Sequence, residues 1–400
     1  MNPLGNRDLI RAINRSTVIN MIKTFGPIAR AEIARRSGLS PATVTGITAE
    51  LIEQKLVFEK TSGDSSGGRP PILLAINPTG AYVIGIKLTE TEAIAALTDL
   101  EANVLNKYNA SLTGQTPEIV ANDLSLVVDN LLHQSGIQKK QLFGVGIGLA
   151  GIVDGVQGVL RHSPIFHWRD VPLKSILENH LHVPVYIEND VNTLTLAEKW
   201  FGAGQNTDHF LTVTVGRGVG LGIVLNGQFY RGAGGGAGEF GHTVINPEGP
   251  ACECGKRGCL EAYVSDPALL NAAAAAGAQV GTIEALVDLA KSGDPEAKKI
   301  FCRAGEILGL GIANLVNLLN PRKIIISGEG TRAGNLLFGP MAESVQRNVM
   351  PGLSYDTSIQ VDPWGDDVWA RGAATLVLRE LFESPVHREA VIVTEVSSVD

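Results

Sequence analysis

The stretches Gly238–Thr243 (Gly-Glu-Phe-Gly-His-Thr) and Cys252–Glu261 (Cys-Glu-Cys-Gly-Lys-Arg-Gly-Cys-Leu-Glu) decide how this chain is interpreted, and they hold three of its four cysteines. A single residue separates the first two cysteines, so a disulfide between them would be strained, because bridged Cα atoms normally lie about 4.4–6.8 Å apart. Three thiolates and one imidazole are the ligand set of a closed tetrahedral zinc site. We therefore predict zinc as the cofactor, held by His242, Cys252, Cys254 and Cys259. The alternative is a group of buried free thiols near an unrelated histidine.

Two carboxylates bracket this loop, since Glu239 precedes the histidine and Glu261 follows the last cysteine. A metal ion that pins the glycine-rich loop would also pin both acids. Carboxylates at fixed positions suit the hydroxyl groups of a polyol, although each could be an ordinary surface acid. The loop therefore indicates a site for a polyhydroxylated ligand.

These two stretches together resemble the signature of the ROK family, which contains bacterial sugar kinases and sugar-responsive repressors. The resemblance extends over almost the whole chain. It implies an α/β protein with an actin-like, hexokinase-like (ribonuclease H-like) body of two lobes, and a sugar bound in the cleft between them.

Composition and charge limit the class of protein. The chain has 400 residues, of which 44% are hydrophobic, which is enough for two or three domains. Residues 1–70 carry ten Lys and Arg against six Asp and Glu, whereas the whole chain has a net charge of −8. A basic head on an acidic body suggests that only the head contacts a polyanion. We expect a cytoplasmic protein without a membrane segment, because the cysteines are clustered, the N-terminus lacks an apolar signal core, and no apolar run approaches about 20 residues.

The head has the pattern of a winged helix-turn-helix DNA-binding domain. A short helix over 29–36 is followed by glycine and by a longer helix capped by Ser40, the spacing of a helix-turn-helix. Two strands, 56–60 and 72–76, flank a flexible loop that would form the wing. The residues expected to contact operator DNA are Ser40, Thr43, Thr45 and Thr48 on the second helix and Arg69 in the wing. The alternative is a small helical bundle used for docking.

The body contains one pattern of elements twice. We expect two runs of three strands, a helix and a further strand, namely 82–86, 92–98, 104–110, 119–132 and 142–148, and then 210–215, 221–225, 228–230, 297–319 and 323–327. This repeat predicts a duplicated α/β lobe. The expected domains are residues 1–77 for the head, 78–192 for the first lobe (completed by a C-terminal helix at 370–384), 193–369 for the second lobe with the zinc loop, and 385–400 for a tail.

The run Gly216–Gly222 contains G-x-G-x-G, which could suggest a dinucleotide site. It lies between two expected strands rather than between a strand and a helix, so the Rossmann interpretation fails. The resemblance implies instead a hairpin that approaches nucleotide phosphates. A glycine-rich hairpin retained only for folding is the alternative.

The remaining sugar contacts come from the end of the strand 185–187. In the ROK family the residue matching Asp190 is the general base of a sugar kinase, and the residue matching Asn189 holds a neighbouring hydroxyl. The resemblance also assigns sugar contacts to Glu239, His242 and Glu261, and a loop over the ring to Gly148–Asp154. Taken alone, Asp190 could simply be a helix N-cap.

Phosphoryl transfer also needs groups that hold the phosphates and Mg²⁺. ROK kinases use Asp-x-Gly-Gly-Thr in the first hairpin, but this chain has Lys87-Leu88-Thr89-Glu90-Thr91 there. A lysine replaces the acid, both glycines are lost, and Glu90 adds negative charge. In the second hairpin, Arg217 stands where a hydroxyl is expected. We therefore expect no enzymatic activity, with Asp190 the vestigial position of a kinase base.

We interpret the chain as a sugar-responsive transcriptional regulator of the repressor type. Its partners would be double-stranded operator DNA, a small sugar and a second copy of itself, as a homodimer or a dimer of dimers. One alternative is a bifunctional sugar kinase that also binds DNA. Another is a regulator switched by a protein partner. Glucose, N-acetylglucosamine, xylose and their phosphates all remain open as effectors.

Overall fold

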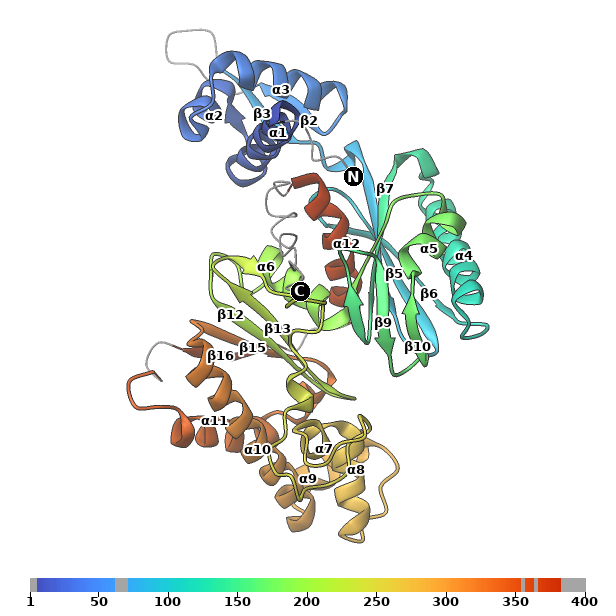
Figure 1. Ribbon diagram of the computed structural model, residues 1–400, viewed down its shortest axis with the longest axis vertical. Coiled ribbons are helices and arrows are strands. Elements are labelled where there is room, and N and C mark those ends of the chain that lie inside the picture. Colours follow the sequence, from blue (N-terminus) through green and yellow to red (C-terminus); the bar gives the residue numbers. More distant parts are fainter. Residues whose placement is uncertain (1–5, 62–70, 354–356, 363–365, 383–400) are drawn as a thin grey trace, which may run out of the picture. The chain divides into compact units, whose positions relative to one another are not determined.

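The computed structural model describes residues 6–61, 71–353, 357–362 and 366–382, which form two compact units (Figure 1). The first unit comprises the described parts of Met1–Ile147, Asp170–Ile187 and Ala373–Asp400, and the second comprises those of Gly148–Arg169 and Glu188–Gly372. The expected first lobe was residues 78–192 completed by a C-terminal helix. The observed first unit also includes a C-terminal segment, but it contains the head and it lacks residues 148–169, which belong to the second unit. The segment 148–169 belongs with the second unit because it bonds to residues of that unit. The carbonyl of Gly151, for example, accepts from Asn189 Nδ2.

The N-terminal part of the first unit is a small helical module with a strand hairpin. Its elements are α1 (Asn6–Phe25), β1 (Ile28–Ala29), α2 (Arg30–Ser37), α3 (Pro41–Glu53), β2 (Val57–Thr61) and β3 (Ile72–Ile76). The strands pair in the order β1-β3-β2, with β2 and β3 antiparallel. The expected wing tip, including Arg69, and the tail at 385–400 lie outside the described residues.

A short turn joins α2 to α3. Gly38 adopts φ +71° and its N–H donates to the carbonyl of Ala34, which ends α2. The Ser40 hydroxyl accepts a hydrogen bond from the amide of Thr43, and Pro41 occupies the first helical turn. The turn and its cap therefore follow from local sequence, as predicted.

The expectation that Thr48 lies on the outward face of α3 is wrong. Thr48 is fully buried, and its hydroxyl accepts from Arg30 Nε at 3.0 Å and donates to the carbonyl of Thr45 at 3.2 Å. The physical reason is helical spacing, since Thr48 follows the buried Val44 by four residues and so shares its face. Thr45 is exposed and Thr43 is half-buried.

The first unit then forms a five-stranded sheet in the order β11-β7-β4-β5-β6. Helices α4 and α5 pack together beside it, with α4 against β5 and β6 (Figure 1). A side chain at Gly146 of β7 would lie 1.9 Å from the carbonyl oxygen of Ala373, so only glycine lets the C-terminal helix approach this strand. The elements are β4 (Tyr82–Leu88), β5 (Glu92–Thr98), β6 (Val104–Ser111), α4 (Pro117–Ser135), β7 (Leu142–Leu149), α5 (Leu173–Leu181), β11 (Val185–Asn189) and α12 (Asp366–Phe382).

The second unit repeats this sheet in the same order, β16-β15-β12-β13-β14. The α/β class and the repeat predicted from the sequence are thus present in the strand order itself. The elements are α6 (Asp190–Phe201), β12 (Phe210–Val215), β13 (Val219–Leu225), β14 (Gln228–Phe229), α10 (Pro295–Leu319), β15 (Lys323–Ser327), α11 (Asn335–Asn348) and β16 (Ser358–Val361). A smaller sheet, β10-β9-β8, comprises β8 (Ile152–Asp154), β9 (Val159–Ser163) and β10 (Trp168–Val171).

Three shorter helices, α7 (Glu261–Val264), α8 (Asp266–Ala275) and α9 (Ile283–Lys291), follow the cysteine-rich loop and pack against α10. Within the described residues, α10 alone is long and apolar enough to cross a membrane by length and composition. In this structure 56% of that apolar window is buried, mainly against α11 and the second sheet. Its hydrophobicity is therefore accounted for by the core that it forms.

Candidate functional site

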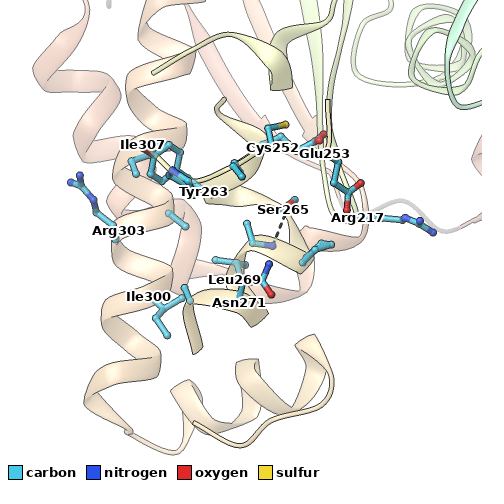
Figure 2. A pocket seen from close by; sticks show the side chains of 18 of the residues that line it. Arg217, Cys252, Glu253, Tyr263, Ser265, Leu269, Asn271, Ile300, Arg303 and Ile307 are labelled. Carbon is cyan, nitrogen blue, oxygen red and sulfur yellow. Dashed lines mark hydrogen bonds between the residues drawn. The ribbon is translucent and has the colours of Figure 1, made fainter. Parts of the chain in front are cut away.

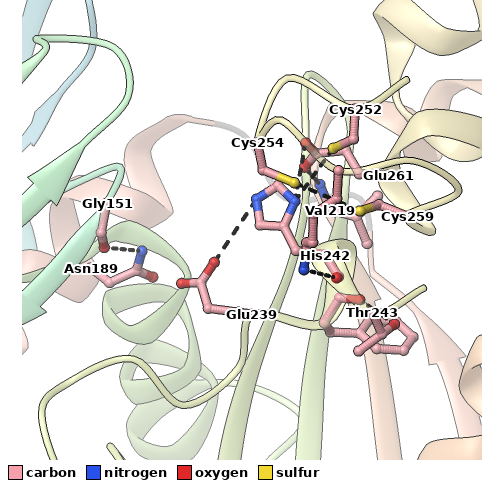
Figure 3. Close-up of polar contacts among 12 residues, drawn as sticks. Gly151, Asn189, Val219, Glu239, His242, Thr243, Cys252, Cys254, Cys259 and Glu261 are labelled. Carbon is pink, nitrogen blue, oxygen red and sulfur yellow. Dashed lines mark hydrogen bonds and ion pairs between the residues drawn. The ribbon is translucent and has the colours of Figure 1, made fainter. Parts of the chain in front are cut away.

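The cysteine-rich loop brings its three thiols and His242 together. The ligand atoms of His242, Cys252, Cys254 and Cys259 all lie within 4.8 Å of one another. The Cys254 and Cys259 sulfurs are 3.7 Å apart, too far for a disulfide, and the Cys252 sulfur is 3.6 Å from His242 Nδ1 (Figure 3). Two sulfurs bound tetrahedrally to one zinc at about 2.3 Å would be about 3.8 Å apart. The geometry therefore fits a four-coordinate metal ion.

The protonation state of the thiols depends on such an ion. Burial raises the pKa of the Cys252 thiol to about 12 and also raises the pKa of the Cys259 thiol. A cation among these sulfurs would stabilise the thiolate forms that burial disfavours. The donor set thus has the chemistry of a metal site.

Backbone geometry of the loop explains its glycines. Gly258 has φ +69°, and a side chain there would lie 1.5 Å from the carbonyl oxygen of Asn246. The same glycine donates its N–H to the carbonyl of Pro250 at 2.7 Å, and the bridge between Val244 and Cys259 closes the base of the loop. Only glycine allows the chain to turn back tightly enough to return the last thiol to the cluster.

The two acids predicted around the loop reach His242 from opposite sides. Glu239 Oε2 lies 4.0 Å from His242 Nε2, and Glu261 Oε1 lies 4.0 Å from His242 Nδ1. Glu261 is also held by its other oxygen, which accepts from the amide of Val219 at 2.9 Å. The imidazole therefore has its Nδ1 on the side of the thiols and its Nε2 toward Glu239 (Figure 3).

Asn189 and Asp190 lie in the same unit, at the junction of β11 and α6. Asn189 caps α6 by accepting from the amide of Asn192, and its Nδ2 donates to the carbonyl of Gly151 at 3.0 Å (Figure 3). Desolvation, the main cause, raises the pKa of the Glu239 carboxyl, and the nearby Glu261 and Asp190 carboxyls act in the same direction. The structure thus brings the five predicted sugar contacts into one neighbourhood of one unit.

Three further residues of this neighbourhood were not predicted. Glu188 is fully buried, and its Oε2 accepts from Arg231 Nε at 2.6 Å. A weak signal for the acid exists in the sequence, because it interrupts an apolar strand directly before Asn189. Nothing local identifies Arg231 as its partner, since 43 residues separate the two along the chain. His162 on β9 is a third unpredicted neighbour, close enough to influence the Glu239 carboxyl.

The first hairpin, predicted to have lost phosphate-binding groups, is closed by its own side chain. Thr89 N and its hydroxyl both donate to the carbonyl of Glu92, and the amide of Glu92 donates back to the Thr89 hydroxyl. Lys87 lies on β4 opposite Ile94. The Thr89 side chain thus closes this turn, and the carbonyls of Glu90 and Thr91 accept from Gln115 and Leu112 outside it.

The second hairpin joins antiparallel β12 and β13, so the strand–turn–strand prediction is confirmed and the Rossmann alternative is excluded. Carboxylates of the protein itself flank it. Glu261 accepts from the amide of Val219 at 2.9 Å, and a side chain at Gly216 would lie 2.3 Å from Glu329 Oε2. Arg217 at its tip is exposed.

A separate cavity of about 520 Å³ lies on another side of the metal loop, between α7, α8 and α10 (Figure 2). Cys252 and Glu261 contribute to its wall, but Asn189, Asp190, Glu239 and His242 do not. Its lining is mainly apolar, with Leu269, Ile300 and Ile307 among the contributors. The cavity is therefore a different space from the neighbourhood of Asn189, Asp190, Glu239 and His242, and Glu261 borders both.

Comparison with known proteins shows the family of this chain. The model of the ROK family matches residues 83–380. The chain belongs to the ROK family. The match begins after β3, so the N-terminal module precedes the part that defines the family.

Individual ROK relatives include regulators and kinases. The xylose repressor of Bacillus spizizenii is 30% identical over 380 residues, covering 95% of this chain and 98% of the repressor. The crystal structure of a ROK family transcriptional regulator, a homologue of the E. coli MLC protein, aligns with a TM-score of 0.85 at 29% identity, covering 94% of this chain and 97% of that chain. A ROK glucokinase from Streptomyces griseus, solved with glucose and AMPPNP, aligns with a TM-score of 0.64 at 30% identity, covering 74% of this chain and 99% of the glucokinase.

Proposed function

We propose that this ROK protein is a sugar-responsive transcriptional repressor, and that its N-terminal module binds operator DNA while its second unit binds a sugar. The observation that carries the proposal is the pairing, in one chain, of the α2–turn–α3 module with a site that groups three carboxyls, one amide and one imidazole. Similarity to a xylose repressor over 98% of that protein's length supports the same assignment.

The N-terminal module has the elements of a winged helix-turn-helix, with α3 as the DNA-reading helix and the β2–β3 hairpin as the wing. Ser40, Thr43 and Thr45 would supply hydroxyl groups to DNA, and Arg69 in the wing would supply a phosphate contact. Thr48 no longer belongs to this set, because it is buried. Operator binding through one such module is weak, so we propose a homodimer that reads two half-sites in the cytoplasm.

The chemistry of the sugar site follows from its groups. Asp190, Glu239 and Glu261 are hydrogen-bond acceptors for sugar hydroxyls. With Nδ1 facing the sulfurs, His242 can present an Nε2–H donor beside Glu239. Asn189 retains one amide hydrogen and one oxygen lone pair beyond its bonds to Gly151 and Asn192.

Zinc is the ion that we propose for the cysteine–histidine cluster, because soft thiolates with one imidazole favour it over harder cations. His242, Cys252, Cys254 and Cys259 would hold it. The ion would supply structural cross-linking, so that His242 and Glu261 keep their positions beside the sugar. Its role is thus to orient the binding groups.

The kinase alternative is disfavoured by both hairpins. Lys87 and Glu90 stand where a ROK kinase has its phosphate-binding motif, and Thr89 closes that turn internally. In the second hairpin the amide of Val219 is bonded to Glu261, and Glu329 abuts Gly216. Bound triphosphate would meet carboxylates instead of open amides. We propose that the protein binds sugar without phosphorylating it.

The test has two parts. A thermal-shift screen should use xylose, glucose, N-acetylglucosamine and their phosphates, since a ligand at 100 times its Kd adds about 2.7 kcal/mol of stability. A mobility-shift titration with palindromic operator DNA should then be run with and without the sugar that binds. We expect one sugar to stabilise the protein and to change its affinity for the operator. Stabilisation by none of these sugars, or operator affinity that ignores the bound sugar, would contradict the proposal.

A further inference from the structure

Three segments of the second unit carry the proposed sugar contacts, and each touches the other two. They are Gly151–Asp154, Glu188–Asn192 and Arg231–Glu239. Asn189 Nδ2 donates to the carbonyl of Gly151 at 3.0 Å, which joins the first two segments. A side chain at Gly235 would lie 2.0 Å from the Val153 carbonyl oxygen, so the first and third segments are in backbone contact.

The remaining contact, between the second and third segments, is a buried ion pair. Glu188 Oε2 accepts from Arg231 Nε at 2.6 Å, and the two side chains are 1% and 25% exposed. Glu188 Oε1 accepts from the Asn189 amide and from Asn192 Nδ2, each at 3.0 Å. A single carboxylate therefore fixes the start of α6 on one side and the arginine on the other.

Arg231 is in turn the first residue of a glycine-rich loop that leads to Glu239. Its carbonyl accepts from the amide of Ala237 at 3.0 Å, which closes the loop two residues before Glu239. Its guanidinium also lies over the ring of Phe229, 4.8 Å from the centroid. Because glycine permits many backbone conformations, such a loop needs anchors of this kind to hold one.

We propose that the Glu188–Arg231 ion pair positions the sugar-binding groups by holding Asn189 and Asp190 in register with Glu239. The proposal rests on the proposed function, because it assigns a role within that sugar site. Stability alone is a weak reason for a buried ion pair, since desolvation offsets much of the attraction and an apolar pair often serves as well. A charged hydrogen bond instead supplies direction. Glu188 and Arg231 are positioning residues, and neither needs to touch the sugar.

The test replaces both charges together, because removing one would leave the other buried and unpaired. In E188Q/R231M the amide oxygen can still accept from Asn189 and Asn192, and the methionine can still cover Phe229. Isothermal titration with D-xylose, D-glucose, N-acetyl-D-glucosamine and their phosphates measures sugar affinity. Metal content and operator binding are measured on the same preparations. The conservative variant R231K keeps the charge, and E343Q/R347M removes a pair on α11 whose side chains are 59–75% exposed.

We expect E188Q/R231M to fold, retain its metal and bind operator DNA, but to bind the sugar about 10- to 100-fold more weakly, the usual range for losing an orienting partner at a metal site. R231K should recover most of that affinity, and E343Q/R347M should bind sugar as wild type does. Unchanged sugar affinity in E188Q/R231M would overturn the proposal, as would R231K no tighter than the double variant. A wild type that binds none of these sugars would instead contradict the proposed function.

Discussion

The loops of the second unit that carry the proposed metal and sugar sites differ from the hairpins β4–β5 and β12–β13 in what surrounds their polar side chains. In the loops, the carboxyl of Glu239 lies near other groups of the proposed site, namely His242, Glu261 and Asp190. In the hairpins, Thr89 and Glu261 bond to backbone amides that a phosphate would otherwise require. We proposed above that this chain does not bind a nucleotide, and the second hairpin is nevertheless formed, with β12 and β13 fully paired.

The largest effect should follow from breaking the metal loop. Cys259→Ser removes a fully buried ligand, and structural zinc contributes about 10–16 kcal/mol in small zinc domains. We expect the variant to lose its metal and its sugar response. Elemental analysis of the wild type should give about one zinc per chain, and Cys302→Ser, at the exposed fourth cysteine, is the matched control. A metal-free Cys259→Ser protein that still binds sugar normally would show that sugar binding does not depend on the metal.

A second prediction concerns Glu198, a fully buried acid on α6 whose Oε1 has no hydrogen-bond partner among the residues that the structure describes. Desolvation is the main reason why the pKa of this carboxyl is raised to about 7. The charge of Asp362 also raises this pKa, and the charge of Lys323 lowers it. The unfolded chain loses this proton near pH 4.5 and the folded chain near pH 7. Stability should therefore fall between these values and level off above pH 7.

Glu198→Gln should remove that pH dependence and stabilise the protein above pH 7 by up to about 3 kcal/mol. Thermal unfolding from pH 5 to pH 8 measures the difference between wild type and variant. Glu343→Gln, at an exposed position of α11, controls for general charge effects. A constant difference between Glu198→Gln and wild type across this range would show that Glu198 ionises normally.

The Asp190→Ala variant tests directly whether the carboxyls of the proposed site bind the sugar. Asp190→Ala should weaken sugar binding by about 10- to 100-fold, or about 1.4–2.7 kcal/mol, because a hydroxyl partner loses a charged acceptor. Operator binding without sugar should be unchanged. Mobility-shift titrations of Asp190→Ala and Glu239→Ala with and without sugar measure both properties. Asp190→Ala or Glu239→Ala protein that still responds to the sugar would contradict the assignment of these carboxyls.

Two threonines of α3 differ in burial, since Thr45 is exposed whereas Thr48 is buried and accepts from Arg30 Nε. Thr48→Val should destabilise the protein by about 1 kcal/mol or more, because Arg30 Nε loses its acceptor. Thr45→Val should leave stability unchanged and alter operator preference. Thermal unfolding and binding to an operator panel distinguish the two. Equal effects of both variants on operator preference would support the expectation that Thr48 contacts operator DNA.

The last prediction is that no kinase activity will be detected. Purified protein should show no ATP-dependent phosphorylation of any sugar that it binds, because the hairpins present carboxylates where phosphates would lie. A coupled assay for ADP measures turnover, with the Asp190→Asn variant as the control for contaminating kinase. Turnover that disappears in this variant would show that the hairpins still support catalysis.

Much of this protein could be predicted from sequence because the deciding signals are local. Periodicity located β5 (Glu92–Thr98), β12 (Phe210–Val215) and β15 (Lys323–Ser327) at their observed bounds, since alternation and turn residues act over a few positions. Ser40 was predicted as a cap for the same reason. The cluster around His242 was predictable because its ligands are close in sequence and their chemistry is specific.

The tertiary structure decided which partners the buried polar groups bond to inside the protein. Thr48 was misassigned although its spacing from Val44 already places it on the buried face, whereas its partner Arg30 became known only from the tertiary structure. Glu188 and Arg231 meet across 43 residues, a separation that no short-range pattern encodes. The domain boundaries differ for the same reason, since the 148–169 segment joins the second unit through contacts such as Asn189 to Gly151. Local sequence specifies elements and ligand chemistry, whereas long-range packing specifies which side chains remain free to bind.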